Sequence, residues 1–135
     1  LVDFYELDGM KKNVLKTGEF LLKVVLPEEA AQRKGCYQKL RVRDSWDFPE
    51  AGVAASWVPG NASSLMVAST ALESIPRLHT EQVEEHLTAG DLDPLALAKI
   101  VQKSVKPVNN TALPPRYRRA MVKTLTKRAL LDILE

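Results

Sequence analysis

The side chains that most often carry chemistry are few in this chain of 135 residues. There is one cysteine, Cys36, and there are two histidines, His79 and His86. Paired histidines bind a metal from one helix when they lie one turn apart, and these two lie two turns apart, so no metal site is predicted. We interpret Cys36 as a small buried hydrophobe and the histidines as solvated or hydrogen-bonded surface residues.

Asp44 and Asp47 are a second candidate, because two neighbouring carboxylates can work as an acid and a base. Both lie in the charged segment RDSWDFPE, residues 43–50, between two apolar runs. Aspartate is also a frequent turn residue, since its side chain accepts hydrogen bonds from nearby backbone amides. We therefore predict that the aspartates fix a corner of the chain, with Arg43 paired to one of them, rather than transfer protons.

Basic residues cluster near the C-terminus and could in principle bind phosphates. The same stretch carries an apolar stripe, so its other positions are expected to face water or a partner subunit, and no aromatic platform accompanies them. The net charge of +2 does not require a polyanionic partner, and no apolar run reaches the roughly 20 residues of a membrane helix. Neither nucleic acid nor a membrane is therefore predicted as a partner. The basic residues are Arg116, Arg118, Arg119, Lys123, Lys127 and Arg128.

The six glycines are isolated from one another in the sequence. A phosphate-binding loop needs clustered glycines, because its backbone amides must approach the phosphate closely. We therefore predict that this chain does not grip a nucleotide by itself.

The two apolar runs beside the charged corner are predicted to be strands. Residues 36–42 alternate in polarity, with Tyr37 and Lys39 on one face, as in a half-buried strand. Residues 52–58 are small and apolar, which is typical of a strand buried on both faces.

Further elements follow from the same rules. We expect a hairpin-like connection at residues 28–35 rather than a helical turn, and a buried stripe on the last helix that runs through Tyr117, Met121, Leu125 and Ala129. Strands followed by helices predict an α+β domain, an antiparallel sheet of three to four strands followed by three helices packed on one face. The other predicted elements are strands at residues 19–26 and 64–69, and helices that start near Thr80, Asp93 and Pro114.

Residues 37–54 contain the pattern Tyr-x-Lys-x-x-x-Arg, then Ser-x-Asp-Phe-Pro and then Gly-Val-Ala. This pattern resembles the C-terminal domain of the FAD-binding (medium) subunit of molybdenum hydroxylases, the family of xanthine dehydrogenase, carbon monoxide dehydrogenase and 4-hydroxybenzoyl-CoA reductase. Two more blocks agree in order: KTGEFLLKVVLP, residues 16–27, resembles the strand that opens that domain, and residues 117–130 resemble its closing helix.

The resemblance implies that residues 1–135 are one domain, the C-terminal part of a longer subunit whose nucleotide-binding domain precedes it. The subunit would belong to an oxidoreductase in which FAD exchanges electrons between iron–sulfur clusters and an external acceptor or donor, while a molybdopterin centre converts substrate. Molybdopterin-binding and iron–sulfur subunits are the implied partners. Residues 1–135 alone are expected to be inactive and to bind FAD weakly or not at all.

Two residues of this domain are implied to line the flavin. Leu21, in the Glu-x-Leu-Leu strand, would pack on the ring and exclude water, and Lys39, in Tyr-x-Lys, would bring a positive charge near the flavin or its phosphates. Gln38 is an alternative to Lys39, because a shift of one residue reverses the face of a strand.

The chain departs from the family at residues 67–71, VASTA, where a glycine-rich turn is usual. A reducing cytoplasm is the expected location, since the single cysteine allows no internal disulfide and the N-terminus shows no secretory signal. The alternative function is a non-catalytic assembly or interaction module that docks through the basic last helix. Nucleic-acid binding is a third and weaker alternative.

Overall fold

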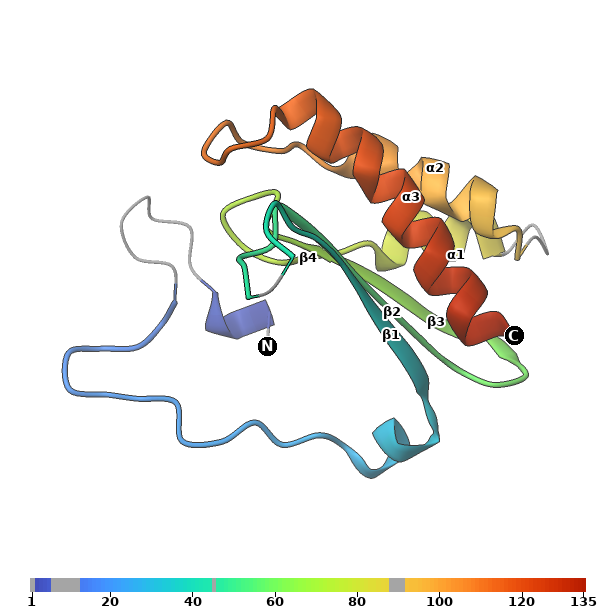
Figure 1. Cartoon of the computed structure of the whole chain (residues 1–135). Coiled ribbons are helices and arrows are strands. Elements are labelled where there is room, and N and C mark those ends of the chain that lie inside the picture. Colours follow the sequence, from blue (N-terminus) through green and yellow to red (C-terminus); the bar gives the residue numbers. More distant parts are fainter. Residues whose placement is uncertain (1, 6–12, 45, 88–91) are drawn as a thin grey trace.

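The computed structural model describes residues 2–5, 13–44, 46–87 and 92–135. These residues form a four-stranded antiparallel sheet with three α-helices on one face, which confirms the predicted fold class (Figure 1). Two short 3-10 helices precede the sheet, η1 (Val2–Phe4) and η2 (Glu28–Gln32). The strands are β1 (Lys34–Leu40), β2 (Ala51–Val58), β3 (Asn61–Thr70) and β4 (Arg77–Leu78), and the helices are α1 (Thr80–Leu87), α2 (Pro94–Ser104) and α3 (Pro115–Leu134).

The sheet is a meander in which each strand pairs with the next, in the order β1-β2-β3-β4. Opposed residues of antiparallel strands share a face, so the register assigns side chains to the two faces. Val53 opposes Ser69 and faces the helices, whereas Gly52 opposes both Lys39 and Thr70 on the other face. We call this second face the open face.

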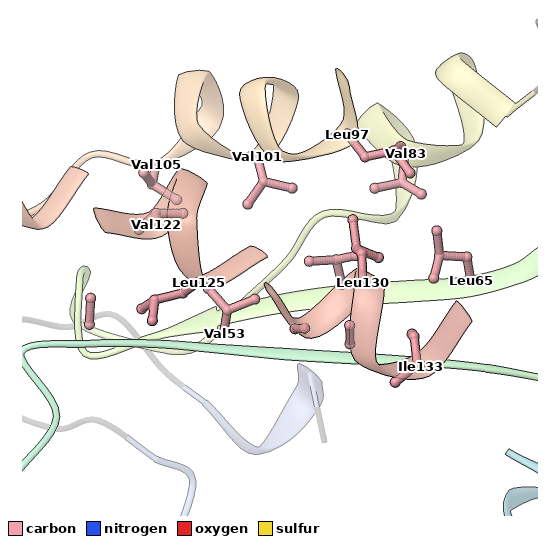
Figure 2. Packing of buried hydrophobic residues seen from close by; sticks show 14 of the residues in the cluster. Val53, Leu65, Val83, Leu97, Val101, Val105, Val122, Leu125, Leu130 and Ile133 are labelled. Atoms are coloured by element: carbon pink, nitrogen blue, oxygen red, sulfur yellow. The ribbon is translucent and has the colours of Figure 1, made fainter. Parts of the chain in front are cut away.

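The hydrophobic core lies between the sheet and the helices (Figure 2). Val53 and Val67 rise from the sheet and meet Val101 of α2 and Leu130 of α3, and all four side chains are fully buried. Burying one such side chain stabilises the fold by about 1.5–3 kcal/mol, so this layer is the main source of stability. Strand β1 adds Cys36 and Leu40, which are partly buried and pack against this cluster.

The buried stripe of α3 is displaced from the predicted one. Tyr117 is 47% exposed, and the neighbouring Arg118 is fully buried instead. Leu125 and Ala129 are buried as predicted. The prediction was wrong at the start of the helix, because polarity alone placed an arginine on the water side. The buried residues are Arg118, Val122, Leu125, Thr126, Ala129, Leu130 and Ile133.

Two predictions for the segment before β1 are wrong. Residues 19–26 form no strand, and their side chains are exposed along an extended segment (Figure 1). The following residues form η2 rather than a hairpin-like connection, although Pro27 does end the extended segment. The fourth strand of the sheet is β4 instead.

The start of α2 shows how a local signal fixes an element. Asp93 is its N-cap, and its carboxylate accepts hydrogen bonds from the amides of Leu95 (2.9 Å) and Ala96 (3.2 Å). Pro94 fills the first helical position, where its missing N–H costs nothing. This N-terminus was correctly predicted. Gly90, where the sequence predicts the end of the helix that starts near Thr80, lies outside the described residues.

Arg118, at the start of α3, binds three other chain segments. Its Nε donates to the carbonyl of Glu50 at 2.6 Å, and its Nη1 donates to the carbonyl of Val108 at 2.7 Å and to Oδ1 of Asn110 at 3.2 Å. Its Nη2 donates to the carbonyl of Ala71. The buried guanidinium therefore joins the start of β2, the end of β3 and the loop before α3.

Ala71 lies in residues 67–71, where the resemblance leads us to expect a glycine-rich turn. Its φ is 63°, in the left-handed region that favours glycine. The turn thus keeps a backbone conformation that glycine would adopt without strain, and the Arg118 hydrogen bond to the carbonyl holds it there.

His79 is fully buried between the sheet and α2, so its prediction as a surface residue was wrong. Ser104 Oγ donates to the carbonyl of Val101 at 2.9 Å, so it must accept from His79 Nδ1, also at 2.9 Å. The neutral ring then accepts from Ser69 Oγ at Nε2, at 2.9 Å. Burial first, and then the charge of Arg77, lower the pKa of His79 to about 4.

Arg118→Met should strongly lower the stability of the domain, because it removes the Arg118 donor from the carbonyls of Glu50, Ala71 and Val108. We expect a loss of about 3–5 kcal/mol in the free energy of unfolding. Arg118→Lys should recover little, since an ammonium lacks the planar fork that reaches several carbonyls. The control is Arg128→Met on the exposed side of α3, expected to change stability by less than about 0.5 kcal/mol. Urea unfolding followed by circular dichroism measures this, and equal losses would contradict it.

Acid should destabilise the fold through His79. The folded pKa, about 4, lies below the ordinary 6.5, so the unfolded chain takes up the proton first. This contribution is complete above pH 6.5 and is lost as the pH falls toward 4. We expect a loss on the order of 2 kcal/mol from this group. Urea titrations across the window test it. His79→Gln should flatten that part of the pH profile, and an unchanged profile would show that another group is responsible.

Candidate functional site

Lys39 lies near the end of the edge strand β1 with its side chain on the open face. Its ammonium donates to the backbone carbonyl of Asp47 at 3.1 Å. An ammonium has three N–H donors, so this contact fixes the charge while leaving donors for a ligand. Gln38 lies on the helix face, where its Nε2 is 3.4 Å from Sγ of Cys36. The register thus places Lys39, and not Gln38, on the open face.

The corner after β1 is built around the Asp47 carboxylate. Its Oδ2 accepts from the amides of Val42 (3.2 Å) and Arg43 (2.9 Å), and its Oδ1 accepts from the amide of Phe48 (2.9 Å). The Arg43 guanidinium donates to the same Oδ1 at 2.7 Å. These bonds, the Arg43 side chain foremost, hold the pKa of Asp47 well below its usual range. The predicted corner and its arginine–aspartate pair are confirmed for Asp47, and none of these four bonds involves Asp44.

The corner presents two aromatic side chains to the outside. Trp46 is 90% exposed and Phe48 is 82% exposed, on either side of Asp47. With Arg43 they line a shallow hollow of about 410 Å³. The sequence placed these residues in a turn but gave no sign that both rings would face outward.

The open face beside Lys39 has small residues at its centre, Gly52 and Ala54. Gly52 lies under the hydroxyls of Tyr37 and Thr70, which are 3.3 Å apart, and any Cβ at this position would overlap both. Gly52 is therefore required for Tyr37 to lie across the sheet. An apolar hollow of about 680 Å³ continues along β3 and β4, lined by Tyr5, Met66, Ala68, Ile75, Pro76, Arg77 and Leu78.

Leu21, the second predicted flavin contact, lies on the extended segment before β1 and is 54% exposed. No strand pairing joins this segment to β1 among the described residues. The structure therefore brings Lys39 together with the corner and the open face, and leaves Leu21 on a separate segment. The role of both residues remains a prediction.

The other candidates form no reactive site in the described part of the chain. Cys36 is half-buried, and desolvation and the nearby Asp132 raise the pKa of its thiol, which disfavours a nucleophilic thiolate. No group of three metal-binding side chains occurs among the described residues. In the same residues, none of the helices has the length and apolar character needed to cross a membrane.

The basic residues of α3 do not form one free stripe. Arg118 is buried, and Arg119 donates to the carbonyls of Gln102 (3.0 Å) and Lys103 (2.8 Å) at the C-terminal end of α2. Arg116 and Arg128 are exposed. At least two of the six basic side chains therefore hold the fold together.

The domain is an α+β fold, a four-stranded antiparallel meander covered on one face by three helices. No protein-family model matches the sequence. Among solved structures, a chain of carbon monoxide dehydrogenase from Hydrogenophaga pseudoflava, in a form that lacks the Mo-pyranopterin moiety of the molybdenum cofactor, has a TM-score of 0.62 at 21% identity, over 77% of this chain and 37% of that one. Quinoline 2-oxidoreductase from Pseudomonas putida 86 gives 0.58 at 16%, over 74% and 36%.

A third structure, the cyanide-inactivated Cu,Mo-CO dehydrogenase, gives a TM-score of 0.61 at 21% identity, over 76% of this chain and 37% of that one. At these identities the likeness shows the fold. The chain spans little more than a third of the length of these solved chains.

Asp47→Ala should loosen the corner without unfolding the domain, because its carboxylate serves only backbone and side-chain donors of the corner. The amides of Val42, Arg43 and Phe48 should exchange with deuterium at least about tenfold faster, while core amides keep their protection. Asp44→Ala is the matched control, since Asp44 makes none of these three bonds. Unchanged exchange at all three amides would contradict the role assigned to Asp47.

Proposed function

We propose that this chain is the flavoprotein-subunit domain of a molybdenum-hydroxylase-type oxidoreductase and forms one wall of its FAD site. The single observation that carries the proposal is Lys39, a cation held by the Asp47 carbonyl at 3.1 Å on the open face of the sheet. The fold supports it, because the solved structures that share this fold include a Cu,Mo-CO dehydrogenase and a carbon monoxide dehydrogenase described by its molybdenum cofactor, of which that form lacks the Mo-pyranopterin moiety. The Tyr-x-Lys-x-x-x-Arg pattern supports it independently.

The residues present fit a flavin, which needs an apolar surface against its ring and a positive charge near its polar edge. Leu21 would supply the first and Lys39 the second. When bound, FAD would pass electrons between iron–sulfur clusters and an external acceptor or donor. This chain would orient the cofactor, exclude water through Leu21 and favour negative charge through Lys39.

The proposed partners are the molybdopterin-binding and iron–sulfur subunits of the complex, in the cytoplasm. The main grip on FAD would come from a nucleotide-binding domain outside these residues. The isolated open face offers one tethered ammonium and no clustered glycine amides, which is too little to hold a dinucleotide.

A non-catalytic assembly module is the second candidate. It is favoured by the apolar side chains exposed before β1, which are typical of a surface that another protein covers. The two candidates differ in one respect: only the first requires Lys39 for FAD binding.

Lys39→Ala in the intact flavoprotein should weaken FAD binding about tenfold, the usual cost of a charge-assisted hydrogen bond. Lys34→Ala is the matched control, because Lys34 is an exposed lysine on the same strand but on the other face. Flavin fluorescence measures both affinities, and residues 1–135 alone should bind no FAD at micromolar concentrations. Equal affinity of the two variants, or tight stoichiometric binding by residues 1–135, would refute the proposed site.

A further inference from the structure

The segment before β1 exposes an unusual amount of apolar surface. Phe20 is 76% exposed, Leu22 is 79% and Leu26 is 74%. Val24 and Val25 are also more than half exposed. Single exposed apolar residues are common in folded proteins, but a contiguous run of this size marks a surface that another body covers.

The same residues have the pattern of a strand. Phe20, Leu22, Val24 and Leu26 would occupy one wholly apolar face, and the other face would carry Leu21, Lys23 and Val25. The run is bounded by Gly18, with φ of 86°, and by Pro27. Among the described residues, none of the backbone hydrogen bonds outside regular elements involves residues 20–26. The segment is extended, and none of the described strands pairs with it.

The domain holds the end of this segment firmly. Arg33 Nε donates to Oγ of Ser56 at 3.2 Å, and its Nη2 donates to the carbonyls of Ser56 (3.1 Å) and Ser64 (2.5 Å). The exposed residues therefore leave the domain from a fixed point. Arg33, which follows η2, attaches this part of the chain to β2 and β3.

The sheet of this domain cannot bury the segment. Its two edge strands are β1, where a fifth strand could add, and β4, which has only the two residues Arg77–Leu78. Helix α3 already packs over β1 and β2, and no described helix lies beyond β1 to cover four large apolar side chains. A second copy of the chain offers the same uncovered edge, so it is equally unsuited.

We propose that residues 19–26 add as a strand to the free edge of a β-sheet in the companion part of the enzyme, with Phe20, Leu22, Val24 and Leu26 in its apolar layer. The solved chains of this fold indicate such a part, because the matched portion is only about 37% of their length. Main-chain hydrogen bonds would supply affinity, and the alternate side chains would fix the register.

The proposal also gives Leu21 its place, and this step alone rests on the proposed function. Neighbouring residues of a strand point to opposite faces, so a strand that buries Phe20 and Leu22 turns Leu21 the other way. Leu21 would reach the flavin as part of the companion's sheet, while Lys39 approaches from this domain.

The proposed strand is tested by hydrogen–deuterium exchange on the native protein. The protein is purified through a tag placed after Glu135, together with any protein bound to it. Amides 20–26 should exchange at least about 100-fold more slowly there than in residues 1–135 alone. Val24→Asp should abolish both the protection and the co-purification of the companion. Val25→Asp is the matched control, an exposed valine on the opposite face, and should change either by less than about threefold. Neither variant should alter the melting temperature of residues 1–135.

Several outcomes would overturn the proposal. Amides 20–26 could be unprotected in the native protein, protected already in residues 1–135, or protected only in a dimer of this chain. Equal effects of Val24→Asp and Val25→Asp would mean that no one face is buried. Loss of FAD in Lys39→Ala with protection retained would separate the docking strand from the flavin site, so each proposal can fail alone.

Discussion

The buried guanidinium of Arg118 is the interaction on which the rest of the structure depends. It binds carbonyl groups at the start of β2, at the end of β3 and in the loop before α3. Glu50 extends this cluster outward: its carboxylate accepts from Thr111 at 2.5 Å, and its amide donates to the carbonyl of Leu40 at 2.9 Å, which closes the corner loop. The position of the corner, and of the Asp47 carbonyl that holds Lys39, therefore follows from a charge buried on the other side of the sheet.

The two faces of the sheet are specialised in opposite ways. The helix face buries branched aliphatic residues such as Val53 and Val67, which supply stability. The open face carries Gly52 and Ala54 at its centre, and the hydroxyls of Tyr37 and Thr70 lie over Gly52. The small residue at position 52 is therefore explained by the packing of Tyr37 across the sheet.

Much of this fold could be predicted from local patterns, because they reflect short-range physics. The corner followed from turn-forming aspartates, and the start of α2 followed from Asp93 beside Pro94. The burial of Arg118 and His79 could not be predicted. Their partners are carbonyl and hydroxyl groups distant in sequence, such as those of Glu50 and Ser69, and polarity alone places an arginine or a histidine at the surface. For the candidate site, the sequence indicated Lys39 and its corner but not the outward-facing Trp46 and Phe48.

The failed strand at residues 19–26 has a different cause. Alternating polarity reports that a segment is suited to a sheet, and it does not report which sheet. Leu21 lies on this segment and Lys39 lies on β1, so a site that uses both can form only when the segment is held by something else. If Leu21 and Lys39 both contact FAD, as proposed, weak FAD binding by residues 1–135 and an exposed apolar segment would be two consequences of one arrangement. The cofactor contacts would belong to different bodies, and docking of the segment would bring them together.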